Sequence, residues 1–428
     1  MEIVKNNKKT IRGWAFFDWA NSAYALVIST AIFPPFFASI SPKEISIFGS
    51  LIDSNTLYSY SISISFLLIA IMTPILSGIA DHSGRRTSFL KLFTIIGSLA
   101  CMALFFFKDA DGSLFGLTAF ILGTIGFGAG IVFYNSYLPD IATEDKYDSV
   151  SAVGYAYGYI GSVILLILIL LLINYKHVFG IESETLPVRI GFLLVGLWWY
   201  GFATITFGSL KDTAVKKFEK SFISKGINEV KVVMNSALKD ANIVKFLVAY
   251  FFFIAGVNVT IYLATVFAQV ELGFQQTNLI ILVLYLQFLA MVGAFFFAWV
   301  SKAIGNKLAL LIQVIIWIGV SIASYFVITT TQFYIIALFV GLVFGGIQSL
   351  SRSTYSKLIK DDINSLASYF SFYDVLTKLA VVAGTFSFGL VNQLTGNMRY
   401  SILSTGVFFI LGFVFLLTIK VPKQKGLS

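Results

Sequence analysis

The sequence predicts an all-α membrane protein whose twelve transmembrane helices form two six-helix bundles, and three observations support this fold class. First, twelve stretches of roughly 20 or more mostly apolar residues run through the chain, and most charged residues lie in the short gaps between them. Second, 57% of the 428 residues are hydrophobic and 12% are charged, at a mean hydropathy of +0.87, so a soluble fold would expose very large apolar patches. Third, one long, Lys-rich gap separates six stretches from the next six.

Each stretch is long enough to cross a bilayer as a helix, which satisfies the backbone donors and acceptors within the segment. The alternating pattern over about 10 residues that marks a transmembrane β-strand is absent from the sequence. We therefore predict spans at residues 13–38, 57–80, 88–107, 114–138, 150–174, 189–210, 243–268, 276–301, 307–328, 332–357, 364–392 and 399–420.

The distribution of basic residues predicts that both termini are cytoplasmic. An even number of spans leaves the termini on one side, and Lys and Arg concentrate in cytoplasmic loops. With the N-terminus inside, the acidic loop 139–149 is the exception among the inner loops, and few basic residues lie outside: Lys43, Lys108, Lys176, Arg189 and Arg399. The net charge of +9 then reflects orientation and attraction to a bilayer with anionic headgroups, without a nucleic-acid partner.

The long gap divides the chain into a bundle at 1–210, a cytoplasmic linker at 211–242 and a bundle at 243–428. Apolar residues recur at roughly helical spacing among the lysines of this linker: Val215, Phe218, Phe222, Ile223, Ile227, Val230 and Val233. The pattern favours an amphipathic helix on the cytoplasmic surface. A solvated, flexible tether is the alternative.

The two halves resemble weak copies of each other. Residues 78–86 (GIADHSGRR) end the second span, and residues 299–307 (WVSKAIGNK) end the eighth; both carry a glycine followed by a polar and a basic residue. Residues 149–159 and 365–375 share an alternation of serine and aromatic residues. A parallel repeat of six helices predicts a pseudo-two-fold axis along the membrane normal, with a cavity near the midplane.

Residues 78–86 resemble the loop between spans 2 and 3 of the major facilitator superfamily. Within that superfamily, further blocks resemble the vacuole-effluxer-like family: residues 13–24 (GWAFFDWANSAY), 133–140 (FYNSYLPD), 346–352 (GIQSLSR), 372–378 and 389–396 (GLVNQLTG). Fungal vacuolar members of this family are linked to autophagy and release amino acids to the cytosol. The resemblance implies a major facilitator fold, transport of a small solute, and, for a bacterial-type member, the plasma (inner) membrane.

Asp18 lies about six residues inside the first predicted span, where an isolated charge is costly and normally faces a water-filled cavity or a partner. Helical spacing places Asp18 and Asn21 near one face together with small residues, and Tyr24 flanks that face. We interpret this face as part of the transport path or of proton coupling. Alternatively, Asp18 only hydrogen-bonds a neighbouring helix.

Span 11 carries Asp374 and Lys378, four residues apart and near mid-span. This spacing lets the two side chains pair within one helix, and a dry environment would favour passing the proton to the carboxylate. The pair is a candidate proton or substrate switch, with a static ion pair that fixes span 11 as the alternative.

Four further polar residues lie in spans 4, 7 and 10, which the resemblance to the superfamily places around the cavity together with span 1. Arg352 could bind a carboxylate or phosphate bidentately, or extend to the headgroups at the cytosolic end of span 10. Asn135, Asn258 and Gln348 are candidate cavity residues, although lone amides also join helices.

The resemblance implies that residues 78–86 help to latch a cytoplasmic gate. The residues assigned to it are Gly78, Asp81, His82, Gly84, Arg85 and Arg86. Gly78 permits close helix approach, and Asp81 can cap span 3. The family pattern usually has arginine where His82 stands, so this position either weakens the latch or makes it sensitive to pH near neutrality.

The preferred function is a secondary transporter that moves a small solute, with protons as the expected coupling ion. We expect no cofactor and no ATP hydrolysis, because the sequence has no Gly-rich phosphate-binding loop of the P-loop type. An intramembrane enzyme acting on lipid or peptide is one alternative, but the two histidines, His82 and His177, lie in loops assigned to opposite faces. The other is a non-transporting membrane receptor. The single Cys101 lies in a span and indicates neither a disulfide framework nor a Cys-based metal site.

Overall fold

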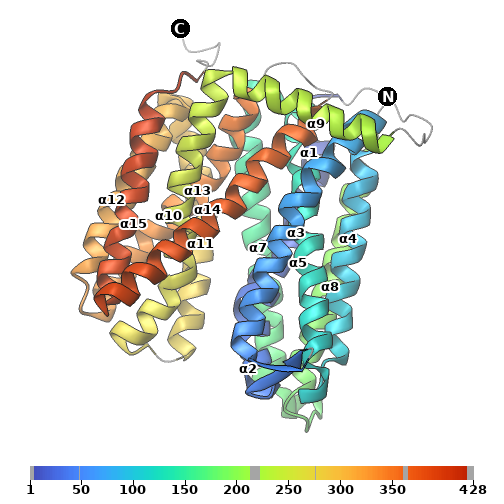
Figure 1. The fold of residues 1–428 in the computed structure, drawn as a ribbon, viewed down its shortest axis with the longest axis vertical. Helices are drawn as coiled ribbons and strands as arrows, with labels where there is room; N and C mark the ends of the chain where they lie inside the picture. The colour runs from blue at the N-terminus through green and yellow to red at the C-terminus, as the bar shows by residue number, and fades with distance from the viewer. Residues whose placement is uncertain (1–3, 48, 213–221, 275, 360–364, 422–428) are drawn as a thin grey trace. The chain divides into compact units, whose positions relative to one another are not determined.

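The computed structural model describes residues 4–47, 49–212, 222–274, 276–359 and 365–421 (Figure 1). Within these ranges, twelve helical segments are long and apolar enough to cross a membrane. Each overlaps one predicted span, from Lys8–Ile40 for the first to Met398–Leu417 for the last. The predicted all-α membrane fold is therefore confirmed, and so are the twelve helices that compose it.

The first half of the chain contains α1 (Lys8–Ala23), the π-helix η1 (Tyr24–Ile32), α2 (Phe33–Ile40), β1 (Glu44–Ile47), β2 (Ser50–Asp53), α3 (Ser54–Ser83), α4 (Arg86–Ala103), η2 (Leu104–Phe106), η3 (Ala110–Gly112), α5 (Ser113–Asn135), α6 (Leu138–Ile141), η4 (Glu144–Lys146), α7 (Tyr147–Asn174), η5 (Lys176–Phe179) and α8 (Leu186–Ser209). The second half contains α9 (Phe222–Lys239), α10 (Ala241–Leu272), α11 (Gln276–Ile304), α12 (Asn306–Tyr325), α13 (Thr330–Leu358), α14 (Leu366–Thr395) and α15 (Met398–Leu417).

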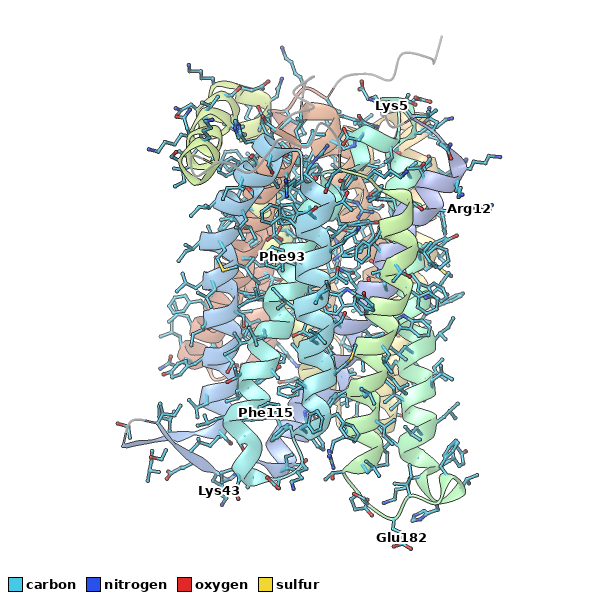
Figure 2. All side chains as sticks on the ribbon, turned by 90° about the vertical axis from the view of Figure 1, so that its right-hand side faces the viewer. Lys5, Arg12, Lys43, Phe93, Phe115 and Glu182 are labelled. Atoms are coloured by element: carbon cyan, nitrogen blue, oxygen red, sulfur yellow. The ribbon has the colours of Figure 1, made fainter. Side chains whose placement is uncertain are left out.

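The first span is a helix of three parts, with the π-helix η1 between α1 and α2. Pro34 and Pro35 occupy the first turn of α2 and have no backbone N–H to donate, so the preceding turn cannot complete a regular α-helical pattern. A short antiparallel hairpin, in which Glu44 pairs with Asp53, then connects α2 to α3. Figure 2 shows Arg12 at one end of the first-half helices and Lys43 and Glu182 at the other end. The hairpin, which begins next to Lys43, therefore lies at the end far from Arg12.

Glycines allow the closest helix pairs to approach. A Cβ on Gly345 of α13 would collide with the carbonyl oxygen of Ala290 on α11, and a Cβ on Gly293 of α11 would collide with the Leu342 carbonyl of α13. In membranes, where lipid is as apolar as the side chains, such small-residue contacts supply the dispersion energy that joins helices. The α11–α13 pair therefore depends on glycine on both sides.

The chain forms two compact units. The first consists mainly of Lys8–Asn135 and Tyr157–Ile227, and the second mainly of Ser136–Ala156 and Asn228–Ser428. Residues 136–156, which the sequence analysis assigned to the first bundle, thus group with the second unit. The division into two transport bodies at the linker stays a prediction.

The linker contains the helix α9, at the place where an amphipathic helix was predicted. Val215 and Phe218 lie outside the described residues. Val233 is buried, whereas Ile227 is 37% exposed, so the apolar residues of α9 do not all share one environment.

Candidate functional site

Asp18 on α1 is buried and has a phenol as its partner. The Tyr134 hydroxyl of α5 donates a hydrogen bond to Asp18 Oδ2 at 2.6 Å. Trp14 holds the same tyrosine: its indole N–H donates to the Tyr134 carbonyl at 3.0 Å, and the two rings stack with centroids 4.5 Å apart. Sequence analysis placed Asp18 in the membrane but did not single out Tyr134, although this residue lies in the block at 133–140.

Asn21 and Tyr24 follow Asp18 along the same segment but differ in their bonding. Asn21 is 1% exposed, and among the described residues neither its side-chain nitrogen nor its oxygen has a hydrogen-bond partner. A buried amide in this state costs free energy unless a water or a solute satisfies it. The Tyr24 hydroxyl instead lies 2.7 Å from Thr124 Oγ1 on α5, which is a contact that joins two helices. Asn21 is therefore the stronger candidate for contact with a solute.

Asp374 and Lys378 form the intrahelical pair that their spacing predicts. Lys378 Nζ lies 2.7 Å from Asp374 Oδ1, with 14% and 7% of the two side chains exposed. The second carboxylate oxygen, Oδ2, is buried and has no hydrogen-bond partner among the described residues. Beside the pair, the rings of Tyr250 and Tyr373 stack with centroids 4.2 Å apart, and the Tyr250 hydroxyl lies 2.8 Å from Thr377 Oγ1. One oxygen of the Asp374 carboxylate, Oδ2, can therefore still accept a hydrogen bond in a mostly buried environment.

Arg352 on α13 is 1% exposed and is held by α7. Its Nε donates to Ser151 Oγ at 2.9 Å, and its Nη2 donates to the Ser151 carbonyl at 2.7 Å. The guanidinium carbon lies 4.2 Å from the centre of the Tyr155 ring, which is a cation–π contact. The alternative in which Arg352 extends to the headgroups does not describe this structure.

The three amide candidates are distributed over different environments. Asn135 ends α5 and is 7% exposed. Asn258 is partly buried and donates to the Ile254 carbonyl of its own helix at 3.0 Å, so its amide nitrogen is used locally. Gln348 is half-buried on α13. Their roles in a transport path stay predictions.

The loop at 78–86 forms a tight connection between α3 and α4. Gly84 adopts φ +70°, a left-handed conformation that glycine reaches without strain, and the Arg85 N–H donates to the Ala80 carbonyl at 3.0 Å to close the end of α3. Arg86 Nε lies 4.0 Å from Asp81 Oδ1. His82 lies in the last turn of α3. Gly78 lies one turn earlier in the same helix.

Asp212, a residue of the linker, caps the N-terminus of α4; the cap that the sequence analysis expects from Asp81 stays a prediction. Asp212 Oδ1 accepts the backbone N–H of Thr87 at 2.6 Å, and the Ser88 hydroxyl donates to Asp212 Oδ2. A carboxylate at this position also interacts favourably with the helix dipole. Asp212 thus ties the start of the linker to the loop at 78–86.

A buried charge network in the second unit was not singled out from the sequence. Asp148, at the start of α7, has a fully buried side chain, and Lys357 of α13 donates to its Oδ2 at 2.9 Å with 1% of the lysine side chain exposed. Ser301 donates to the same oxygen at 2.8 Å, and Asn306 Nδ2 donates to Oδ1 at 2.7 Å. Lys357 also donates to Asn306 Oδ1 at 2.7 Å. The feature of the sequence that could have indicated this network is the acidic character of the loop at 139–149, which contains Asp148.

The residues that make these contacts lie on one face of α7. Ser151 and Ala152 follow Asp148 by three and four positions, and Tyr155 follows them by four and three, which is the spacing of neighbours on a helix surface. Ala152 packs into a cluster with alanines of α11, which brings the helix close enough for the polar bonds to form. The first two turns of α7 therefore contact other helices of the second unit in three ways: Asp148 pairs with Lys357, Ala152 packs against the α11 alanines, and Ser151 binds Arg352.

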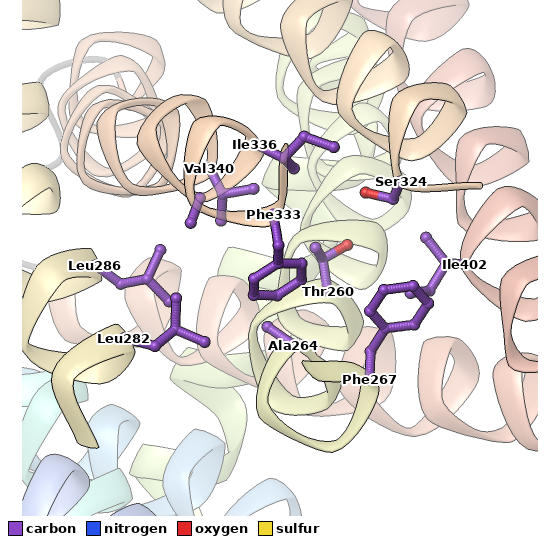
Figure 3. Close-up of a pocket in the computed structure, with 11 residues that line it drawn as sticks. Thr260, Ala264, Phe267, Leu282, Leu286, Ser324, Phe333, Ile336, Val340 and Ile402 are labelled. Carbon is purple, nitrogen blue, oxygen red and sulfur yellow. The ribbon is translucent and has the colours of Figure 1, made fainter. Parts of the chain in front are cut away.

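A pocket in the second unit is a different kind of environment (Figure 3). Its lining is mostly apolar, with Phe267, Leu282 and Phe333 among its residues, and Thr260 and Ser324 as hydroxyl groups. The Thr260 hydroxyl is already used, because it donates to the Gly256 carbonyl at 2.9 Å. With no ionisable group among its lining residues, this pocket does not join the candidate coupling residues.

Comparisons with known proteins agree with this architecture. A sequence profile of the family described as "Vacuole effluxer Atg22 like" matches residues 6–426. An uncharacterized MFS-type transporter, YxiO of Bacillus subtilis (strain 168), is 30% identical over 422 residues, which cover 97% of this chain and 95% of the relative. Autophagy-related protein 22 of Kluyveromyces lactis is 27% identical over 417 residues, covering 88% of this chain and 80% of the relative. Among solved structures, the major facilitator superfamily transporter FucP in the outward conformation superposes with a TM-score of 0.72 at 14% identity, over 96% of this chain and 97% of that one.

Proposed function

Because the chain belongs to the vacuole effluxer Atg22-like family and is a multi-pass membrane transporter of the major facilitator type, we propose that it moves a small solute by alternating access and couples this movement to protons. Amino acids and related metabolites are the first candidate substrates, because the resemblance noted in the sequence blocks implies them. The proposed location is the plasma (inner) membrane of a bacterium with both termini cytoplasmic, which the bias of Lys and Arg toward the inner loops supports.

The observation that supports coupling most directly is the half-satisfied carboxylate of Asp374. An unpaired charge inside a membrane costs several kcal/mol, so neutralising one member of a buried ion pair favours a new partner for the other. A proton delivered to Asp374 would neutralise the carboxylate and release Lys378, whose ammonium could then meet an anionic group of the solute. Oδ2, which has no partner among the described residues, is the oxygen at which this proton would be held.

Asp18 is the second candidate for proton coupling. The Tyr134 hydroxyl, a neutral donor, stabilises its carboxylate by a hydrogen bond at 2.6 Å. The unbonded amide of Asn21 lies one helical turn away on the same face of α1. We assign to this face the contact with the solute in the first unit.

The Asp148 network is proposed as a latch that holds residues 136–156 against the second unit in one conformation of the transport cycle. Both carboxylate oxygens of Asp148 accept hydrogen bonds, which stabilises the network. Separating residues 136–156 from the rest of the second unit would require breaking several charge-assisted hydrogen bonds together. The loop at 78–86, now tied to Asp212, is the proposed counterpart in the first unit.

The experiment is transport by the purified protein in liposomes with an imposed pH gradient. A metabolite library is first screened by thermal stabilisation, because a ligand at 100-fold its dissociation constant adds about 2.7 kcal/mol to stability. Asp374→Asn should abolish accumulation driven by the gradient and retain exchange of solute at equal concentrations. The control Thr385→Val, on an exposed part of the same helix, should behave like wild type.

Each outcome has a defined meaning. Accumulation by both Asp374→Asn and Asp18→Asn at the wild-type level would reject proton coupling through these two carboxylates. Solute flux by the wild type without accumulation in the pH gradient would instead indicate uniport. Binding of a solute without any flux, in protein that is correctly folded, would instead favour the non-transporting receptor.

A further inference from the structure

The segment that precedes α1 is hydrogen-bonded to the α6–α7 connection, residues 141–146. The backbone N–H of Asn6 donates to the Ile141 carbonyl at 2.8 Å. Its side chain binds Thr143 in both directions: Nδ2 donates to Thr143 Oγ1 at 2.8 Å, and Oδ1 accepts the Thr143 backbone N–H at 3.1 Å. All three residues belong to the second compact unit. Asn6 therefore binds this connection through its backbone and its carboxamide together.

The backbone conformation of Asn6 indicates that this contact is specific. Its φ is +63°, and it is the one non-glycine residue with a positive φ among those that the structure describes. Asparagine reaches this left-handed region more easily than most residues, but the conformation still persists only where surrounding contacts hold it. Lys5 and Asn7 on either side are exposed, whereas Asn6 is partly buried. The hydrogen bonds to Ile141 and Thr143 are the contacts that hold it.

These bonds complete the hydrogen bonding of a buried backbone segment. The short helix α6 ends at Ile141, and Ala142 and Thr143 are extended. Ala142 is completely buried, so the polar backbone groups beside it need partners within the protein. Asn6 supplies a donor for the Ile141 carbonyl and an acceptor for the Thr143 N–H. The geometry of this connection therefore depends on a residue far away in the sequence.

Thr143 is joined to Asp148 by continuous helical structure. The Thr143 carbonyl accepts the Lys146 N–H at 2.9 Å, which closes the turn of η4. The helix α7 begins at Tyr147, directly after η4, and Asp148 is its second residue. A displacement of Thr143 is thus passed to Asp148 without a flexible loop between them.

Opposite charges flank the contact. Lys5 precedes Asn6, and Glu144 and Asp145 follow Thr143; all three side chains are exposed. The acidic loop that is the exception among the predicted inner loops thus lies beside a basic segment of the same chain. Exposed charges attract each other weakly, so the hydrogen bonds of Asn6 are the main attachment.

We propose that Asn6 is a positioning residue: residues 4–7 form a strap that holds the α6–α7 connection, and through it Asp148, in the geometry that binds Lys357. Asn6 acts through this connection, because its hydrogen bonds end at Ile141 and Thr143. The inference rests on the proposed latch and adds the element that sets its strength. Loosening the strap opens the latch more often without removing any hydrogen bond of the latch itself.

Hydrogen–deuterium exchange of residues 147–156, measured on the full-length protein in phosphatidylcholine nanodiscs, tests the proposal. Asn6→Gly removes the carboxamide and keeps the positive φ without strain, which alanine would not. Thr143→Val removes the hydroxyl alone, and Thr143→Ser restores it. The matched control is Val4→Gly, which adds the same backbone freedom at a side chain that is 71% exposed.

Asn6→Gly should speed exchange at 147–156 by about fivefold, the factor expected for one net hydrogen bond lost. Thr143→Val should have a smaller effect in the same direction, and Thr143→Ser and Val4→Gly should match wild type. In the double variant Asp148→Asn/Lys357→Met, which removes the latch, exchange should already be fast and Asn6→Gly should add no further increase. A purely structural role of Asn6 would give the same increase in both backgrounds.

The outcomes separate the strap from the latch. Unchanged exchange in Asn6→Gly and Thr143→Val, or an equal increase with and without the latch, would overturn the strap and leave the latch standing. Wild-type exchange in the double variant alone would overturn the latch and the strap with it. Elution and melting temperature are compared in each variant, and Thr143→Val decides the matter if Asn6→Gly does not fold.

Discussion

Removing the lysine of the Asp148–Lys357 pair should destabilise the protein far more than removing a surface lysine. Both side chains are almost completely buried, with 0% and 1% exposed. In Lys357→Met, Asp148 keeps the two neutral donors Ser301 and Asn306 but loses its counter-charge. Breaking one side of a buried ion pair costs about 3–5 kcal/mol, because the remaining charge stays out of water without compensation.

A double-mutant cycle separates the pair from its surroundings. Asp148→Asn should also cost about 3–5 kcal/mol, since it leaves the Lys357 ammonium buried. The double variant Asp148→Asn/Lys357→Met leaves no uncompensated charge, so its loss should be several kcal/mol smaller than the sum of the two single losses. The control is Lys108→Gln, because Lys108 and its partner Asp109 have side chains that are 65% and 53% exposed, and exposed pairs contribute little.

The assay is unfolding of the detergent-solubilised protein, followed by tryptophan fluorescence and repeated at two salt concentrations. The buried pair should show little dependence on salt, because screening acts mainly on exposed charges. Two results would refute the reasoning: single losses no larger than that of Lys108→Gln, or losses that add in the double variant. Either would mean that the charges at 148 and 357 are not coupled in the folded protein.

Three further perturbations test other contacts. Gly345→Ala should cost about 1–3 kcal/mol by overpacking against the Ala290 carbonyl, whereas Gly319→Ala, where a Cβ meets open space, should be neutral or stabilising by up to about 1 kcal/mol in the same melting assay. Tyr134→Phe should cost about 1.5–3 kcal/mol because it removes a hydrogen bond to a buried carboxylate, and an unchanged melting temperature would contradict that role. His82→Arg keeps a positive charge at every pH, so its transport profile between about pH 5.5 and 8 should be flatter than that of wild type, and identical profiles would reject a pH-sensitive latch.

The fold was predictable because its dominant signals are local. Span length and hydropathy depend on about 20 consecutive residues, and the bilayer leaves the helix as the way to satisfy the backbone of each span. The α9 helix was predictable for the same reason, since its periodicity lies within the linker. The Asp374–Lys378 pair was also visible, because its partners are four residues apart on one helix.

The other contacts of the candidate site could not be predicted, because their partners are distant in the chain. Tyr134 is 116 residues from Asp18, and Lys357 is 209 residues from Asp148. Pairing at such separations depends on which helix faces meet, and composition does not determine this. Even at the N-terminus of α4, the backbone N–H of Thr87 donates to Asp212, which is 125 residues away.

The two buried ion pairs of the second unit differ in the one respect that decides their roles. Asp148 accepts hydrogen bonds at both carboxylate oxygens, from Asn306 at Oδ1 and from Ser301 and Lys357 at Oδ2, so protonating it would sacrifice bonds on every side. Asp374 is bonded to Lys378 through Oδ1, while Oδ2 has no partner among the residues that the structure describes. Protonating Asp374 would break one ion pair, whereas protonating Asp148 would break a network of bonds at both carboxylate oxygens, and this difference is the reason for proposing Asp374 rather than Asp148 as a coupling residue. The proposed roles follow from this contrast: the Asp148 network is the proposed fixed attachment, and the Asp374–Lys378 pair is the one proposed to change its charge during transport.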